Sequence, residues 1–240
     1  MKSYDLVGSI AILNEKAKNK GKIAKELLKD HKNIRTIVAR KGMHHGLYRL
    51  RKTKYIAGEK TKETTHKENN SLIKLNIDTC YFSPRTASER LRIAKLVKKN
   101  ETILVMFSGV APYPLVIAKN ANPKRIYGIE INEEAHNYAL KNVKLNKLNN
   151  IELIKGNVKK IIPKLKIKFD RIIMPLPKTS SRYISLPLKH LKQKGYLHYY
   201  LFSRRVPQKQ IKSLKIKKIT KLNQIAPGKY KYCIDFQKVA

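Results

Sequence analysis

The sequence predicts an α/β protein with a parallel sheet in its larger part, preceded by a small α+β domain. From about residue 100 onward, strand-like segments alternate with helix-like segments, whereas the first 80 residues show short mixed elements. Parallel strands need long crossovers, usually helices, so this alternation favours a parallel sheet. We therefore expect a small domain over residues 1–80 and an α/β domain over residues 81–240.

The small domain is predicted from short segments of changing periodicity. An apolar start over residues 6–12 precedes a basic helix over about 16–28 and a strand over 34–39. Residues 41–70 carry glycines and many charges, which indicates hairpins and loops. Residues 71–77 alternate apolar and polar side chains, as a strand does.

The α/β domain opens with Ser83-Pro84, a typical start for the helix that we expect over residues 87–97. The helices that follow between strands are expected over 114–120 and 133–145. The predicted strands cover residues 103–107, 125–129, 151–154, 169–174 and 195–201. Two later strands, near 216–219 and 230–236, are expected to close the far edge of the sheet.

The charge of the chain predicts a polyanionic partner. Its 240 residues include 54 Lys and Arg against 16 Asp and Glu, a formal net charge of +38. Each phosphate that such a protein neutralises releases counterions, so RNA or DNA is the natural partner. A lysine-rich surface of a thermophile normally has matching Glu, which is scarce here. An anionic membrane is less favoured because no basic amphipathic anchor is evident.

Composition also limits location and metal binding. No apolar run approaches the roughly 18 residues of a membrane span. The amino terminus contains Asp5 and lacks the apolar core of a signal peptide, so we expect a cytoplasmic protein. Cys80 and Cys233 are far apart in the sequence and indicate buried thiols in place of a disulfide framework or a Cys-rich metal site.

A strand-to-helix turn and a later acid indicate a nucleoside-containing cofactor. Phe107-Ser108-Gly109 leaves the first strand of the α/β domain, and Glu130 ends the second strand about 20 residues later. Asn157 follows the third strand, where its amide can face an adenine edge. The chain lacks the dinucleotide and Walker glycine patterns, so S-adenosylmethionine fits better. The alternative for Glu130 is an acid that complements a helix dipole.

The fourth strand is followed by Pro175-Leu176-Pro177. Two prolines give a rigid extended loop at the carboxyl edge of the sheet, where substrate meets cofactor in open α/β folds. The alternative is that these prolines only terminate the strand.

Four blocks together resemble the archaeal and eukaryotic tRNA guanosine 37 N1-methyltransferase family, over roughly residues 3–239. The blocks are Tyr81-Phe82-Ser83-Pro84-Arg85-Thr86-Ala87-Ser88-Glu89-Arg90, Met106-Phe107-Ser108-Gly109-Val110, Gly128-Ile129-Glu130-Ile131-Asn132 and the Pro-Leu-Pro loop. The resemblance implies a class I (Rossmann-like) methyltransferase domain, a small N-terminal RNA-positioning domain and the anticodon loop of tRNA as partner. Within this family, the chain resembles the archaeal wyosine-biosynthesis branch, whose members methylate N1 of guanosine 37, C7 of 4-demethylwyosine, or both.

The resemblance also implies roles for individual residues. Glu89 would be the general base, and Arg49 would stabilise the charge that develops on the guanine oxygen when N1 loses its proton. Without the resemblance, Glu89 and Arg90 would be a solvated first helical turn and Arg49 a surface cation. We expect the cofactor and its entrance to be surrounded by Arg85, Arg90, Phe107, Gly109, Glu130, Asn157 and Pro175. No metal is implied, and we expect a monomer.

Two departures from the family pattern affect the substrate. Pro175 stands where family members commonly have Asn, which predicts a wider, less polar pocket suited to the tricyclic base. Many relatives also have a further N-terminal domain that checks the outer corner of tRNA, whereas this sequence starts with the domain that precedes the catalytic one. We therefore expect relaxed discrimination of tRNA shape, with lysines supplying unspecific phosphate contacts.

Two other functions remain open at this point. A related wyosine-pathway family transfers the aminocarboxypropyl group of the same cofactor. A catalytically silent RNA-binding protein on the same scaffold is the second alternative. RNA binding alone requires neither Gly109 nor Glu130 nor Glu89, so their presence favours an enzyme.

Overall fold

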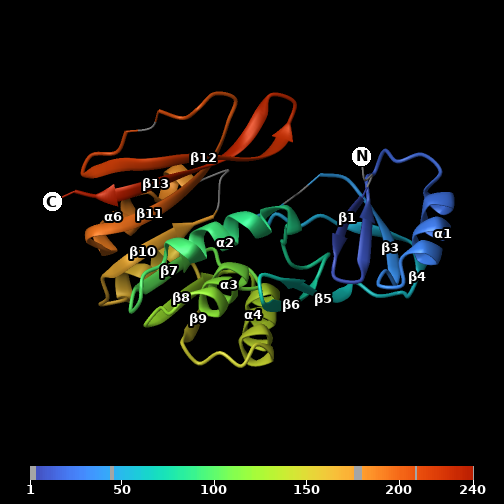
Figure 1. Cartoon of the computed structure of the whole chain (residues 1–240), viewed down its shortest axis with the longest axis horizontal. Helices are drawn as coiled ribbons and strands as arrows, with labels where there is room; N and C mark the ends of the chain where they lie inside the picture. Colours follow the sequence, from blue (N-terminus) through green and yellow to red (C-terminus); the bar gives the residue numbers. More distant parts are fainter. Residues whose placement is uncertain (1–3, 44–45, 176–179, 209, 240) are drawn as a thin grey trace.

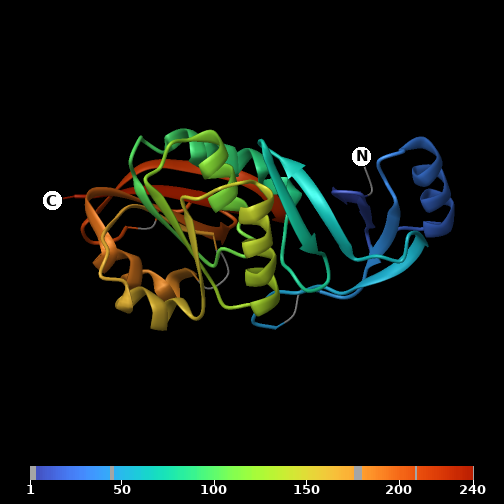
Figure 2. The ribbon, with the colours of Figure 1, turned by 90° about the horizontal axis from the view of Figure 1, so that it is seen from below.

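The computed structural model describes residues 4–43, 46–175, 180–208 and 210–239. Its strands form a four-stranded sheet, a seven-stranded sheet and a two-stranded hairpin. Figures 1 and 2 show the small N-terminal sheet at one end of the molecule and the large sheet at the other, with the hairpin between them. No helix of these residues is long and apolar enough to cross a membrane.

The small domain has the predicted α+β character. Its sheet has the order β1-β2-β3-β4, with β2 and β3 parallel, and one helix packs on it through Ala24 and Leu27. The elements are β1 (Tyr4–Val7), β2 (Ile10–Leu13), α1 (Lys20–Asp30), β3 (Thr36–Arg40) and β4 (Thr53–Gly58).

A hairpin of β5 (Glu63–Glu68) and β6 (Ser71–Asn76) contacts both larger parts. Towards the small domain, the backbone N–H of Ser9 donates to Thr64 Oγ1 at 2.9 Å. Towards the α/β domain, β6 packs against a helix described below. This hairpin begins within the segment predicted as hairpins and loops and agrees with that prediction, whereas the domain boundary at residue 80 stays a prediction.

The α/β domain has a seven-stranded sheet of order β12-β13-β11-β10-β7-β8-β9. The strands from β11 to β9 are parallel, whereas β13 lies antiparallel between β12 and β11. Its elements are η1 (Pro84–Thr86), α2 (Ala87–Leu96), β7 (Thr102–Met106), α3 (Pro112–Asn120), β8 (Arg125–Glu130), α4 (Glu133–Leu145), β9 (Ile151–Lys155), α5 (Val158–Ile161), η2 (Ile162–Lys164), β10 (Phe169–Met174), η3 (Ser180–Tyr183), α6 (Ser185–His190), β11 (Leu191–Ser203), β12 (Leu214–Ala226) and β13 (Lys229–Lys238).

Both faces of this sheet are covered by helices, as its apolar strands require. Along β7, Ile103 and Val105 point to the side of α2 and α3, while Leu104 and Met106 point to the side of α5. Successive strand residues face opposite sides, so each strand contributes to both cores. The two thiols, Cys80 and Cys233, are buried and free, as expected.

The predicted parallel sheet and its two added strands are confirmed. The bounds expected for β10 and α4 coincide with those observed. β12 is much longer than the four residues expected, because it extends from Leu214 to Ala226 and pairs with β13 through several register shifts.

Candidate functional site

A cavity of 420 Å³ lies at the carboxyl ends of four neighbouring strands, β10, β7, β8 and β9. We name it the strand-end cavity, and its volume is typical of a small-ligand site. Its lining includes Phe107, Gly109, Glu130, Asn157, Pro175 and Tyr183. Loops of the parallel sheet meet at this edge, so residues distant in the sequence come together.

The turn after β7 shapes the floor of the strand-end cavity. Phe107, Gly109 and Ala111 have positive φ angles of 55°, 57° and 67°. Only glycine adopts this conformation without steric cost, and strained backbone of this kind persists where its surroundings hold it in place. Here the N–H of Ser108 donates to the carbonyl of Ile129 at 2.9 Å, which ties the turn to β8.

Glu130 presents a buried carboxylate to the strand-end cavity. Its Oε2 accepts from the N–H of Gly109 at 2.7 Å, and its Oε1 accepts from the N–H of Asn132 at 2.8 Å. Burial raises the pKa of Glu130, and these backbone bonds partly oppose the rise. An ionised carboxylate has about four acceptor positions. The carboxylate therefore keeps capacity for a ligand hydroxyl, which fits the ribose of an adenosyl group.

Apolar and amide side chains complete the strand-end cavity. The ring of Phe107 meets the ring of Tyr183 edge to face, with centroids 5.1 Å apart. Asn157 accepts from the N–H of Lys159 at 2.9 Å, so its side chain is oriented at the cavity rim. Pro175 lines the cavity, whereas the rest of the Pro-Leu-Pro loop, Leu176 and Pro177, lies outside the described residues.

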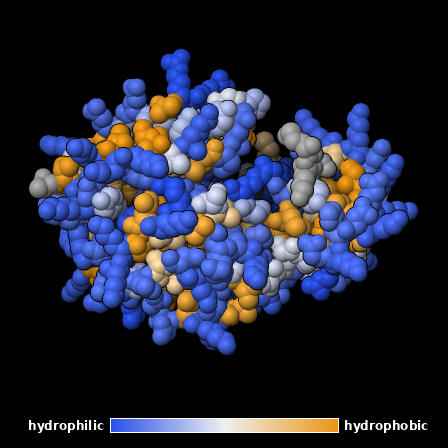
Figure 3. Space-filling model, in the orientation of Figure 1, coloured by the Kyte–Doolittle hydropathy of each residue, from blue (hydrophilic) through white to orange (hydrophobic). Residues whose placement is uncertain are grey.

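A second cavity, of 430 Å³, lies between the two domains, and we name it the cationic cavity. Charged side chains that line it include Asp5, Arg40, Arg49, Arg51, Arg85 and Lys231. In Figure 3 the surface is hollowed between the two domains, on the side where β1 approaches the β12–β13 hairpin.

The cations of this cavity repel one another. Burial, followed by the nearby Arg51 and Arg85, lowers the pKa of Arg40. Burial also lowers the pKa of Lys231 to about 8, and Arg90 adds to this effect. Asp5 accepts from Arg40 and, at 2.7 Å, from Arg85 Nε. One carboxylate among five cations leaves a site that fits an anion.

The two cavities adjoin, because Arg49 and Tyr81 line both. The guanidinium carbon of Arg49 lies 4.8 Å from the centroid of the Tyr81 ring. Arg49 has a φ of 54°, so its backbone is held in an uncommon conformation at this junction. A group bound in one cavity can therefore meet a group bound in the other.

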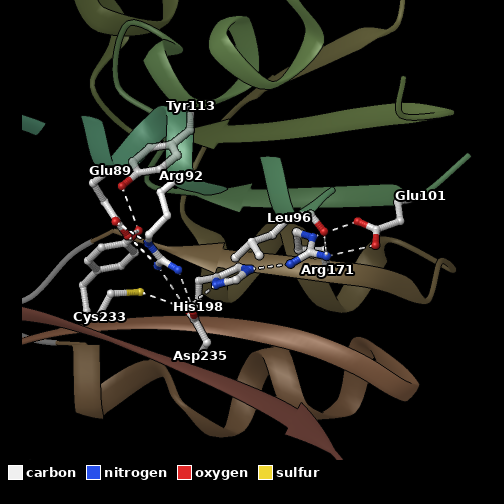
Figure 4. Close-up of polar contacts among 10 residues, drawn as sticks. Glu89, Arg92, Leu96, Glu101, Tyr113, Arg171, His198, Cys233 and Asp235 are labelled. Atoms are coloured by element: carbon white, nitrogen blue, oxygen red, sulfur yellow. Dashed lines mark hydrogen bonds and ion pairs between the residues drawn. The ribbon is translucent and has the colours of Figure 1, made fainter. Parts of the chain in front are cut away.

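Glu89 lies in a buried hydrogen-bond network (Figure 4). Its carboxylate accepts from the Tyr200 hydroxyl at 2.6 Å and from Arg92 Nε at 2.6 Å. Tyr113 donates in turn to the Tyr200 hydroxyl at 2.9 Å. Arg92 also contacts Asp235 at 2.7 Å. The orientation of Glu89 is therefore set by residues from α2, β11 and β13.

The network continues along the same face of the sheet through His198 to Arg171 (Figure 4). His198 Nε2 faces Arg171 at 2.6 Å and must accept, so its Nδ1 donates to Asp235 at 2.7 Å. Burial lowers the pKa of His198, consistent with a neutral ring. Burial opposes ionisation of Asp235, but bonds from His198 and Arg92 outweigh it and lower its pKa. Arg171 is paired with Glu101 at 2.7 Å.

The structure brings most of the predicted site residues to the two cavities. The strand-end cavity is lined by Arg49, Phe107, Gly109, Glu130, Asn157 and Pro175, and the cationic cavity by Arg49 and Arg85. Among the described lining residues, neither Glu89 nor Arg90 occurs. Arg90 instead binds Glu68 of the hairpin through two nitrogens.

Other lining residues were not found from the sequence. Asp5, Arg51 and Lys231 belong to distant segments that meet only in the folded chain. In a sequence with 54 basic residues, no local signal separates Arg51 or Lys231 from the rest. The position of Arg51 two residues after Arg49 was the one available indication.

The sheet with its antiparallel β13, the glycine turn after β7 and the acid that ends β8 define a class I methyltransferase that uses S-adenosylmethionine. Residues 64–225 match the TRM5/TYW2 methyltransferase domain, and residues 1–61 match the TYW2 N-terminal domain. The chain belongs to the TRM5/TYW2 methyltransferase family.

Individual relatives agree with this assignment. The chain is 36% identical over 203 residues to the tRNA (guanine(37)-N(1))-methyltransferase Trm5b of Pyrococcus abyssi, covering 83% of this chain and 60% of that protein. It is 35% identical over 252 residues to the tRNA (guanine(37)-N(1))/4-demethylwyosine(37)-methyltransferase Taw22 of Nanoarchaeum equitans, covering 84% of each. The structure of aTrm5 in complex with tRNALeu superposes with a TM-score of 0.88 at 32% identity, covering 99% of this chain and 72% of that chain.

Proposed function

We propose that the chain transfers the methyl group of S-adenosylmethionine to the purine at position 37 of tRNA, at N1 of guanosine, at C7 of 4-demethylwyosine, or at both. The observation that carries the proposal is the junction of the two cavities at Arg49 and Tyr81. One cavity suits an adenosyl group and the other suits a nucleotide with its phosphates. The activities for which the two relatives are named support this choice of substrate.

The cofactor supplies an electrophilic methyl group when it is bound, and the protein holds it. Glu130 would accept hydrogen bonds from the ribose hydroxyls. Phe107 and Tyr183 would exclude water from the cofactor in the strand-end cavity. Holding donor and target base in adjoining cavities removes much of the entropic barrier to a reaction between two molecules.

Arg49 and Glu89 act on the target base. Guanine N1 bears a proton, so its methylation needs a base, and loss of the proton builds negative charge on O6. Arg49 lies at the junction of the cavities and stabilises that charge through its guanidinium group. Glu89 takes the proton from N1.

Glu89 lies directly behind the cationic cavity. It follows Thr86, which lines that cavity, by one helical turn, and its charge acts on Lys231, which also lines it. The bonds from Arg92 and Tyr200 orient the carboxylate. Preorganisation of this kind fixes the direction of the carboxylate before RNA binds.

Incubation with S-adenosylmethionine and tRNA carrying either guanosine or 4-demethylwyosine at position 37, followed by nucleoside mass spectrometry, tests the proposal. We expect a product heavier by one methyl group. A much heavier adduct would identify aminocarboxypropyl transfer, and no product with retained RNA binding would identify a silent RNA-binding protein. Glu89→Gln should lower guanosine methylation by roughly 100-fold or more with cofactor affinity unchanged.

Pro175 decides between the two bases. Its ring lines the strand-end cavity at the position where family members commonly have Asn, so a polar contact is absent there. Pro175→Asn should raise guanosine methylation relative to 4-demethylwyosine methylation. An unchanged ratio would contradict the role given to Pro175.

A further inference from the structure

A row of lysines follows the outer face of α1. Three of them lie within the helix and two directly flank it, and all five are exposed. They are Lys18, Lys22, Lys25, Lys29 and Lys32. The spacings of four and three residues place neighbours on one side of a helix, one turn apart.

The row lies opposite the face that packs on the sheet. The buried residues of α1 are Ala24 and Leu27, which contact the core formed with β3 and β4. At 100° per residue, Lys22, Lys25 and Lys29 lie within about 60° of one another, on the far side of the helix from Leu27. These three lysines, which we name the α1 lysine row, span about 10 Å.

At its N-terminal end the α1 lysine row does not stabilise its own helix, although Lys29 lies in the last turn, where a cation is favourable. The first turn of α1 contains no acidic residue, and Asn19 caps it without a side-chain hydrogen bond. Cations near a helix N-terminus oppose the helix dipole, at a cost of a few tenths of a kcal/mol or more. Lys20 and Lys22 therefore lie in the first turn of α1, where the helix dipole favours acidic residues. Binding to a partner explains their placement better than folding does.

The chemistry of the row selects the phosphates of RNA as its partner. A helix that binds a membrane inserts its apolar face, but the apolar face of α1 is occupied by its own sheet. The remaining row of charges, with one lysine per helical turn, suits a chain of phosphates. Figure 1 shows α1 at the end of the molecule opposite the C-terminus, beyond β1 and β3, so RNA held there lies outside both cavities.

We propose that the α1 lysine row binds the sugar-phosphate backbone of the substrate RNA, away from the target nucleotide. The inference rests on the proposed RNA substrate and assigns it a second contact surface. Phosphate contacts fix register and orientation without reading sequence. The row therefore contributes to RNA affinity and leaves the chemical step unchanged once RNA is saturating.

The test compares two triple variants that remove equal charge. One carries Lys22→Gln, Lys25→Gln and Lys29→Gln. The matched control carries Lys119→Gln, Lys144→Gln and Lys166→Gln, three exposed lysines of the α/β domain. Gln and Lys have similar helix propensity, so α1 should remain folded. Affinity for a tRNA transcript with guanosine at position 37 is measured at several salt concentrations.

We expect the row variant to bind RNA roughly 10- to 100-fold more weakly at 0.1 M salt, with a slope of log affinity against log salt reduced by about two units. The control should keep the slope within about one unit of the parent. Equal changes in both variants would show that only net charge matters and would overturn the proposal. Unchanged RNA binding with lost binding to phosphatidylserine vesicles would also overturn it, in favour of a membrane.

Methyl transfer at saturating RNA separates this inference from the proposed function. If the parent methylates tRNA, the row variant should keep its kcat and raise its KM for RNA. If the parent transfers no methyl group, the proposed function fails, while the salt slopes still decide whether the row binds RNA.

Discussion

Lys231 places a titrating cation in the wall of the cationic cavity. Its pKa, ordinarily 10.5, is lowered to about 8 by burial and by the neighbouring Arg90 and Arg49, while Glu89 opposes the fall. Below pH 8 the side chain is charged and attracts a phosphate. Above pH 8 it becomes neutral within the folded protein, and this attraction is lost.

RNA affinity should therefore fall as the pH rises from 7 to 9. Lys231→Gln removes the titrating group, so it should weaken binding about 5- to 10-fold at pH 7, as expected for one lost phosphate contact at 0.1 M salt. Binding by the variant should then be nearly flat over this range. Fluorescence anisotropy with labelled tRNA at four pH values measures both effects, with the exposed Lys166→Gln as control. Parallel pH profiles for parent and Lys231→Gln would contradict the assignment.

At the residue scale, sequence reasoning found the residues that depend on local pattern. Gly109 and Glu130 follow strand ends, and both line the predicted cofactor site. The long-range contacts of the Glu89 network could not be predicted. Tyr200 lies 111 residues from Glu89, and Asp235 lies 143 residues from Arg92. Contacts of that separation follow from strand order, which periodicity along the chain does not reveal.

At the element scale, Asn142 of α4 and Asn146, which caps the C-terminus of α4, bind the backbone of β6. Asn142 accepts from the N–H of Lys74 at 2.7 Å and donates to its carbonyl at 2.9 Å. Asn146, one helical turn later, makes the same pair of bonds with Leu72, at 2.9 and 2.6 Å. A helix thus supplies the hydrogen bonds that a neighbouring strand would supply, and the hairpin is held against the α/β domain.

Asn142→Ala should lower the free energy of unfolding by about 2 to 4 kcal/mol, because it leaves the part-buried N–H and C=O of Lys74 without their side-chain partner. The side chain of Asn142 is fully buried, so water has little access to replace it. Urea unfolding followed by circular dichroism measures the change. The exposed Asn137→Ala on the same helix should alter stability by less than about 0.5 kcal/mol. Equal losses in both variants would show that the bonds to β6 are unimportant.

Secondary structure was predictable where one periodicity of apolar residues holds over a whole element. The alternation of strands and helices predicted a parallel sheet and the bounds of α4 and β10, but not the order of the strands in that sheet. It did not give β5, whose sequence is polar and charged, because its stability comes from pairing with β6. The hydrogen bonds of Asn142 and Asn146 could not be predicted either, since their partners lie on another element, β6.

At the scale of the whole molecule, Asp5 links the two domains. It lies on β1 of the small domain and accepts from Arg40 of the same domain and from Arg85 of η1. The bond to Arg85 crosses the cationic cavity that separates the domains. Asp5 therefore helps to set the distance between Arg49, carried by the small domain, and the strand-end cavity.

Asp5→Ala should lower kcat for tRNA methylation roughly 10-fold, because a misplacement of about 1 Å in a reacting complex is costly. Cofactor affinity should stay unchanged, since Asp5 does not line the strand-end cavity. RNA affinity should not fall, because the variant removes a negative charge. Single-turnover kinetics and calorimetric titration with S-adenosylmethionine separate these effects. Asp30→Ala, an exposed acid on α1, is the control of equal charge, and an equal loss of kcat there would contradict the positioning role.

The long strand β12 forms one edge of the large sheet and carries Lys215, Lys217, Lys218 and Lys221. An edge of 13 residues exposes backbone donors and acceptors that can pair with the edge of another chain. Lysines along such an edge disfavour that pairing, because joining two copies would bring like charges together in a confined space. The basic strand thus disfavours edge-to-edge aggregation of the protein.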